Sequence, residues 1–318
     1  MNPYVYPRSD QKAELTLRKQ NSRFLHYLVQ WKSALDTGYP ETDIVQGEFF
    51  LPRTGQKPPL AILVHGLGDY SVTPCKLLAA SLLKKGFASF VPYLIIHSKR
   101  IPESMRERMP YLTPDEWFKT YQVSVVDILQ IVDWVYTREE LDSQRIVTMG
   151  ISFGGGVSSI AMGIDNRIKA GVFIVSGGNQ NKMSWLSKDS SYREKYPRSE
   201  EEHLKIQHSY SEYLEKVSEH GFENVSTENN SFLTDPMTFA GKLKGRPIFM
   251  INALQDKYFP KEAVIDFWQA LGEPPIRWID SGHSSLWLHY PSIRRDIVDF
   301  LESNSIISNS DRQQGVTK

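Results

Sequence analysis

The chain has 318 residues, of which 40% are hydrophobic and 23% charged, and its 37 basic side chains are balanced by 37 acidic ones. This composition is typical of a globular protein with a sizeable core and excludes a disordered chain. A nucleic-acid-binding protein would show a basic excess, and no apolar run approaches the roughly 20 residues that span a bilayer. We therefore expect neither nucleic acid nor a membrane span.

Cys75 is the single cysteine, so no internal disulfide and no cysteine-type metal site is expected. The N-terminal sequence lacks the apolar segment that a secretory signal requires. These two observations favour a cytoplasmic protein and leave its oligomeric state open.

The N-terminal region shows two different patterns. Apolar side chains within residues 10–36 fit an imperfect helical face, and predict an N-terminal helical extension over residues 1–40. Residues 44–51 then predict a strand that ends before Pro52.

From residue 60 onward, short apolar runs alternate with helical patterns. The predicted strands are bounded by turn residues and cover 60–66, 87–94, 145–150, 168–177, 246–252 and 275–280. The predicted helices lie between and after them, over 74–85, from 114 onward, and over 154–163, 261–271 and 284–301. This alternation predicts an α/β fold with a mostly parallel central sheet flanked by helices.

Residues 179–235 interrupt this alternation. The segment is polar and charged with scattered aromatic side chains, and part of it is compatible with a helix. We interpret it as a helical cap or lid inserted into the core, which then comprises residues 41–178 and 236–302. The polar tail, residues 303–318, is expected to be flexible.

Ligands of parallel α/β sheets bind at the carboxyl ends of the strands, and three side chains with matching chemistry follow predicted strands. Residues 150–154 read GISFG, which fits the G-x-S-x-G turn that presents a nucleophilic serine between a strand and a helix. A glycine-rich turn with a surface serine would explain the motif equally well, but the flanking strand and helix favour Ser152 as a nucleophile.

A serine hydroxyl needs a base to remove its proton, and the base needs a carboxylate to orient it. His283 follows the last predicted strand, and Asp256 follows the strand before it, which gives the chain order Ser, Asp, His. Taken alone, each could be an ordinary loop residue. Asp280 is a competing carboxylate, but its position suits the end of a strand or a turn.

An oxyanion intermediate needs backbone N–H donors. The N–H of Phe153, directly after the nucleophile, and the N–H of Leu67, between two glycines of the loop after an early strand, are the candidates. His65, at the start of that loop, is interpreted as a buried residue that shapes the loop.

Four segments together resemble the α/β-hydrolase superfamily, over roughly residues 60–300. HGLGD is similar to its oxyanion loop, GISFG to its nucleophile elbow, ALQD to its acid loop and SGH to its histidine loop. Among subgroups the chain looks most like the dienelactone-hydrolase and prolyl-oligopeptidase-like esterases, and it lacks the HGGG run of lipase-type esterases. The resemblance implies hydrolysis of an ester, thioester or amide through an acyl-enzyme, without a cofactor or a metal.

We therefore predict a serine carboxylesterase that acts on a small-molecule ester. A peptidase or an acyltransferase could use the same triad, and a non-catalytic binding protein could share the fold. Tyr70 and Trp185 are candidate substrate-pocket residues, although Trp185 could equally anchor the cap. The basic loop 95–113 fits a solvated surface better than a site for an anionic substrate.

Overall fold

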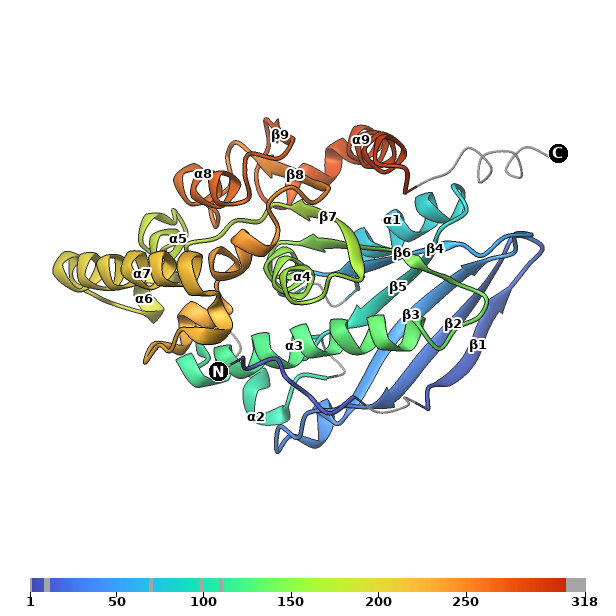
Figure 1. Cartoon of the computed structure of the whole chain (residues 1–318), viewed down its shortest axis with the longest axis horizontal. Helices are drawn as coiled ribbons and strands as arrows, with labels where there is room; N and C mark the ends of the chain where they lie inside the picture. The colour runs from blue at the N-terminus through green and yellow to red at the C-terminus, as the bar shows by residue number, and fades with distance from the viewer. Residues whose placement is uncertain (1, 9–11, 69–70, 98–99, 109–110, 307–318) are drawn as a thin grey trace.

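The computed structural model describes residues 2–8, 12–68, 71–97, 100–108 and 111–306. Within these ranges the chain forms a nine-stranded sheet in the order β1-β2-β3-β5-β4-β6-β7-β8-β9 (Figure 1). The strands β5, β4, β6, β7, β8 and β9 run parallel to one another. β3, β2 and β1 extend the sheet beyond β5, each antiparallel to its neighbour. A mostly parallel sheet is therefore confirmed.

The parallel strands lie within a few residues of the predicted positions. They are β4 (Pro59–Val64), β5 (Ala88–Tyr93), β6 (Asp142–Ile151), β7 (Ile168–Ile174), β8 (Ile248–Ala253) and β9 (Ile276–Ile279). Both faces of β4 are covered, which is why its sequence is apolar at every position rather than at alternate ones.

Helices cover both faces of the sheet (Figure 1). One face is packed by α3 (Pro114–Val135), α4 (Phe153–Ile164) and α8 (Lys261–Ala270), and the other by α1 (Thr73–Leu83) and α9 (Tyr290–Ser303). The start of α3 is set locally, since Thr113 and Glu116 form a reciprocal capping box around Pro114. The two faces thus carry separate buried clusters.

The predicted N-terminal helical extension is wrong. Residues 14–32 form two antiparallel strands, β1 (Glu14–Gln20) and β2 (Phe24–Lys32), and β2 pairs along its whole length with β3 (Ile44–Pro52). The buried side chains Val29 and Trp31 alternate along β2 and contact the sheet core, where Trp31 packs against Phe90. The open edge of β3 explains why this segment forms strands. A strand there pairs with the backbone N–H and C=O groups of β3, which a helix would leave unpaired.

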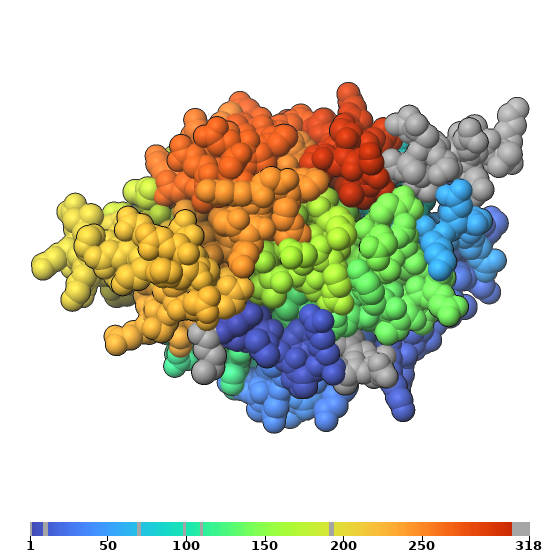
Figure 2. Space-filling model, in the orientation of Figure 1, coloured from blue at the N-terminus to red at the C-terminus, as the bar shows by residue number. Residues whose placement is uncertain are grey.

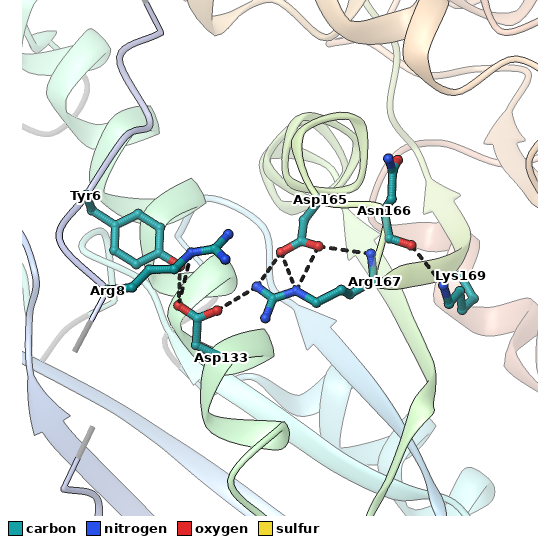
Figure 3. Close-up of polar contacts among 7 residues, drawn as sticks. All are labelled: Tyr6, Arg8, Asp133, Asp165, Asn166, Arg167 and Lys169. Carbon is teal, nitrogen blue, oxygen red and sulfur yellow. Dashed lines mark hydrogen bonds and ion pairs between the residues drawn. The ribbon is translucent and has the colours of Figure 1, made fainter. Parts of the chain in front are cut away.

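The N-terminal arm, residues 2–8, lies along α3 and is held by polar contacts (Figure 3). The Tyr6 hydroxyl donates to Asp133 Oδ2 at 2.6 Å, and Arg8 Nε lies 4.0 Å from the same oxygen. Arg167 joins Asp133 to Asp165, with Nη2–O distances of 2.5 and 2.6 Å. The arm is therefore tied to α3 through the same aspartate that holds the turn after α4.

The segment between β7 and β8 is helical. It contains α5 (Gln180–Leu186), α6 (Ser190–Lys195), α7 (Glu200–His220) and two short 3-10 turns, η3 (Phe222–Asn224) and η4 (Asn230–Thr234), before η5 (Pro236–Lys242) leads back to the sheet. Figure 2 shows α7, in yellow, projecting at one end of the molecule. Tyr210, Tyr213 and Phe232 form a buried cluster that holds α7 against η4.

Two other short elements complete the described chain, η1 (Pro40–Thr42) before β3 and η6 (Ser285–His289) before α9. The predicted flexible tail lies outside the described residues from 307 onward. Over the part of the chain that the structure covers, none of the helices combines the length and the apolar character needed to cross a bilayer.

Glu48 of β3 should make stability depend on pH. Burial opposes ionisation of Glu48, but contacts from His26, Lys76 and Tyr93 outweigh burial and lower its pKa from 4.5 to about 2. His26 Nε2 and Lys76 Nζ lie 3.0 and 2.8 Å from the carboxylate. Because the folded-state pKa is the lower one, this stabilisation is complete above about pH 4.5 and is lost as pH falls towards 2.

The Glu48→Gln variant should therefore lack part of the acid destabilisation of the wild type. The free energy of unfolding of the wild type, relative to the variant, should fall by roughly 3 kcal/mol between pH 5 and pH 2. Urea unfolding at a series of pH values measures this difference. Glu228→Gln, at an exposed position, serves as the control, and equal slopes for wild type and Glu48→Gln would contradict the prediction.

Candidate active site

Ser152 lies at the sharp turn between β6 and α4. Its backbone has φ 55° and ψ −120°, a strained conformation for a residue with a side chain. The turn is held in place because the Ser152 N–H donates to the carbonyl oxygen of Ile174 at 2.8 Å. Strain maintained by the surrounding structure is characteristic of functional positions.

The glycines on either side of Ser152 are required by close backbone approaches. A Cβ on Gly150 would lie 2.1 Å from the carbonyl oxygen of Gly154, and a Cβ on Gly154 would lie 2.3 Å from that of Val64. These distances are far below van der Waals contact, and the opposing atoms are backbone atoms that cannot rotate away. The motif therefore lets α4 start against β4 and places Ser152 at the carboxyl edge of the sheet.

The structure brings together the three side chains predicted as a triad. His283 Nε2 lies 3.0 Å from Ser152 Oγ, and His283 Nδ1 lies 2.7 Å from Asp256 Oδ2. The Asp256 side chain is only 2% exposed and that of His283 is 17% exposed. The three residues follow β6, β8 and β9, so the predicted convergence at one sheet edge is observed.

Asp256 is held by its own loop. Its second oxygen, Oδ1, accepts hydrogen bonds from the backbone N–H groups of Tyr258 and Phe259, at 2.8 and 3.1 Å. The rings of the same two residues contact the His283 imidazole, Tyr258 edge-on and Phe259 stacked, with centroids 4.9 and 5.9 Å away. Sequence reasoning missed these two aromatic side chains, although their place directly after Asp256 was a usable signal.

The competing carboxylate, Asp280, takes no part in this arrangement. It is exposed, and its Oδ1 accepts a hydrogen bond from the Gln255 amide at 2.7 Å. Asp280 therefore ends β9 at the surface, and the interpretation of this residue as part of a turn agrees with the structure.

The loop after β4 lies beside the nucleophile. A Cβ on Gly66 would be 3.3 Å from Ser152 Cβ, so the Gly66 backbone is in near contact with the serine. The N–H of Phe153 lies at the first position of α4, where a helix leaves its N–H groups without intrahelical partners. Phe153 thus follows Ser152 in the chain, and Gly66, the residue before Leu67, lies next to Ser152 in space.

His65 is wholly buried at the base of this loop. Its ring contacts the carbonyl oxygen of Gly66 and the N–H of Leu94. Burial is the largest influence on its pKa, which is lowered from 6.5 to about 4. His65 is therefore neutral near pH 7 and shapes the loop, as interpreted from the sequence.

Of the two predicted pocket residues, the structure describes Trp185. Tyr70 lies outside the described residues. Trp185 of α5 stacks on His203 of α7, with centroids 4.6 Å apart, and Arg198 lies over its ring. These contacts lie within the insertion, so the reading of Trp185 as an anchor of the cap fits better than a role in the pocket.

Aromatic side chains of α3 contact the ring of Phe153, the residue directly after the nucleophile. The Phe153 ring is 4.7 Å from that of Tyr121 and 6.2 Å from that of Trp117. Trp117 also donates from Nε1 to the Tyr196 hydroxyl of the insertion at 2.7 Å. Their spacing of four residues on a helix was the only signal in the sequence, and it does not distinguish a site wall from ordinary core.

The basic loop between β5 and α3 is only in part the solvated surface expected, since Arg106 and Arg108 are exposed but Arg100 is buried. It carries the one-turn helix α2 (Glu103–Arg106). Arg100 is 2% exposed and pairs with the buried Asp127 of α3 at 2.6 Å, while Arg108 pairs with Glu116 at 2.7 Å. These two arginines attach the loop to α3 through ion pairs. Because their charges are already paired, they are unsuited to bind an anionic substrate.

Within the described ranges, no group of three or more His, Cys, Asp or Glu side chains is arranged to hold a metal ion. The site consists of a hydroxyl, an imidazole and a carboxylate in hydrogen-bonded series, next to backbone N–H groups. Such an arrangement can activate the hydroxyl for attack on a carbonyl carbon.

A mostly parallel sheet flanked by helices, a serine on the turn after β6, and an acid and a histidine after β8 and β9 define an α/β hydrolase. Residues 32–303 match the family described as alpha/beta hydrolase domain containing 18. The chain belongs to this family.

A curated relative is an uncharacterized 31.7 kDa protein of Escherichia coli from the traX-finO intergenic region. It is 30% identical to the chain over 121 residues, which make up 38% of each protein. The chain thus matches well under half the length of this relative.

Solved structures with the same fold include several esterases. The acetyl xylan esterase of Paenibacillus sp. R4 superposes with a TM-score of 0.64 at 21% identity, covering 92% of this chain and 89% of that one. Acetyl xylan esterase 1 of Thermoanaerobacterium sp. has a TM-score of 0.58 at 19% identity, covering 86% and 83%. A Pyrococcus furiosus esterase has a TM-score of 0.57 at 16% identity, covering 88% and 93%. At these identities the likeness establishes the fold.

Proposed function

We propose that this protein is a serine hydrolase that cleaves carboxylic esters through an acyl-enzyme. The observation that carries the proposal is the continuous hydrogen-bonded series from Ser152 Oγ to His283 to Asp256, with distances of 3.0 and 2.7 Å. The strained φ of Ser152 adds support, because it holds the hydroxyl at the exposed edge of the sheet.

In the acylation step, Ser152 Oγ attacks the ester carbonyl carbon and His283 Nε2 takes the hydroxyl proton. Asp256 keeps the other proton of the imidazole on Nδ1 and stabilises the positive charge that develops. Collapse of the tetrahedral intermediate breaks the bond to the alcohol oxygen, and His283 returns its proton to that oxygen. The products are the free alcohol and the Ser152 ester of the acid.

Deacylation repeats these steps with water as the nucleophile. His283 removes a proton from water as its oxygen attacks the acyl-enzyme, and then protonates Ser152 Oγ as the acid leaves. In both halves the negative charge on the former carbonyl oxygen is stabilised by the N–H groups of Phe153 and Leu67. Such preorganised donors are worth roughly 100-fold or more in rate each.

Several neighbours of the same fold are described as esterases, which favours ester over amide cleavage. A peptidase would cleave an anilide at a rate comparable to that of the matched ester, and an acyltransferase would pass the acyl group to an added alcohol in preference to water. Comparing an ester with its anilide, and analysing products with an alcohol present, separates these activities.

The proposal is tested by labelling with a fluorophosphonate probe. The probe should modify Ser152, as located by peptide mass spectrometry, and the Ser152→Ala variant should remain unlabelled. A panel of p-nitrophenyl esters from acetate upward would then rank acyl length. Absence of labelling in the folded wild type, together with absence of hydrolysis across the panel, would favour a non-catalytic binding protein on this fold.

A further inference from the structure

We propose that His65 is a positioning residue that orients the Gly66–Leu67 peptide, so that the Leu67 N–H points at the oxyanion. This inference rests on the proposed function, since it assigns a role within the same site. It goes beyond a general structural role because it specifies which ring nitrogen acts, on which atom, and with what effect on the reaction.

The first step of the argument is a single hydrogen bond. His65 Nδ1 lies 2.8 Å from the carbonyl oxygen of Gly66. That carbonyl shares one planar peptide unit with the Leu67 N–H, and in a trans peptide the C=O and N–H bonds point in opposite directions. A restraint on the Gly66 oxygen is therefore also a restraint on the direction of the Leu67 N–H.

The second step identifies the tautomer. His65 Nε2 lies 3.1 Å from the backbone nitrogen of Leu94. A backbone N–H can only donate, so Nε2 must carry a lone pair and the proton must be on Nδ1. The ring is 0% exposed, which disfavours its charged form. Leu94 thus maintains His65 as a neutral donor to Gly66.

The third step explains why this loop needs an external restraint. Gly66 and Gly68 flank Leu67, and glycine has the least conformational restriction of any residue. Gly66 cannot be exchanged for a stiffer residue at no cost, because a Cβ there would lie 3.3 Å from Ser152 Cβ and from the Ile151 oxygen. The close approach favours glycine, and His65 supplies the rigidity that glycine lacks.

Neighbouring residues hold the imidazole itself. The ring of His97 packs edge-on against His65 at 5.6 Å and is stacked on Tyr93 at 4.1 Å. Arg100, paired with Asp127, donates to the carbonyl oxygen of Tyr93 at 2.8 Å. The basic loop after β5 therefore braces the oxyanion loop through these contacts.

Two substitutions separate the two hydrogen bonds of His65. In His65→Asn, the side-chain amide N–H can take the place of Nδ1 and donate to Gly66, while the acceptor for Leu94 is lost. In His65→Gln, the longer side chain can accept from Leu94 through its oxygen, while the donor to Gly66 is lost. Positioning through Gly66 predicts that Asn preserves more activity than Gln, whereas a purely structural link between β4 and β5 predicts the reverse or no difference.

The expected result for His65→Gln is a kcat lowered about 10- to 100-fold, with KM changed by less than about 3-fold. This loss is smaller than for complete removal of an oxyanion donor, because the N–H is misdirected rather than deleted. His65→Asn should lose less than about 5-fold in kcat. A trifluoromethyl ketone, which forms a tetrahedral adduct carrying an oxyanion, should bind His65→Gln more weakly by about the same factor as kcat falls. Equal kcat losses, or a greater loss in Asn than in Gln, would overturn the inference.

A measurement on the wild type does not depend on either variant folding. Nitrogen-15 NMR of the histidine rings at pH 7 should show a neutral imidazole with its proton on Nδ1, assigned to His65 by connectivity from its Nε2 to the Leu94 N–H. A proton on Nε2, or a charged ring, would overturn the inference. This test needs no activity, so its failure is distinguishable from failure of the proposed function, which the probe and ester assays of the wild type examine.

Discussion

Replacing Ser152 by Ala should lower kcat for an activated ester such as p-nitrophenyl acetate by on the order of 10⁶-fold. The reason is that the hydroxyl is the only group placed to form the covalent intermediate, and His283 has no proton to accept without it. Residual hydrolysis of about 10³- to 10⁴-fold over water is expected, because the oxyanion donors remain. Steady-state kinetics provide the measurement, at enzyme concentrations high enough to detect this residual activity.

The matched control for this variant is Ser211→Ala. Ser211 lies on the exposed face of α7, where its hydroxyl bonds only within the helix, to the Gln207 carbonyl oxygen. Its kcat should equal that of the wild type. If Ser152→Ala kept more than a few per cent of wild-type activity while remaining pure and folded, Ser152 would not be the nucleophile.

Replacing Asp256 by Asn should lower kcat/KM about 10⁴-fold, with little change in fold. Asn can still accept at Oδ1 from the N–H groups of Tyr258 and Phe259, which now hold the aspartate. Its amide N–H₂ would then face His283 Nδ1 and force the imidazole proton onto Nε2. In that tautomer Nε2 points a proton at Ser152 and cannot accept the serine proton.

Asp280→Asn provides the control for this prediction, since Asp280 is an aspartate of the neighbouring loop that bonds to Gln255 and not to His283. Its kcat/KM should remain within about 2-fold of wild type, in line with other surface changes. Thermal unfolding of both variants shows whether a loss of activity reflects a loss of structure. A strong loss of kcat/KM in Asp280→Asn with little loss in Asp256→Asn would mean that Asp280, and not Asp256, orients His283.

The triad was accessible to sequence reasoning because each member follows a recognisable strand. The strands β6, β8 and β9 are short apolar runs ended by Gly or by polar residues, and parallel strands present their carboxyl ends at one edge. Ser152, Asp256 and His283 could therefore be placed together without knowing any distance. Asp280 was a competing carboxylate by the same argument; its place at the end of a strand disfavoured it, and its bond to Gln255 agrees with that interpretation.

The N-terminal strands were not accessible in the same way. The apolar residues of 10–36 fit both a helical and a strand period, so the pattern by itself could not decide between them. The decision came from pairing: β2 pairs with β3, whose free edge offers hydrogen bonds to a strand, and β1 pairs with β2. A pattern within one segment does not show which strand will lie beside that segment, because this neighbour is present only after the sheet has formed.

The sequence by itself determined the α/β architecture, the strained turn at Ser152 and the order of the catalytic candidates, because these depend on local periodicity and on glycines required by close backbone contact. Only the tertiary structure decided which side chains surround the nucleophile. Trp117 and Tyr121 of α3 reach the ring of Phe153, and Tyr258 reaches the His283 imidazole, through packing between segments that are distant in the chain. Contacts of this kind arise from the folded arrangement of distant segments, and the spacing of these residues along the chain does not identify their partners.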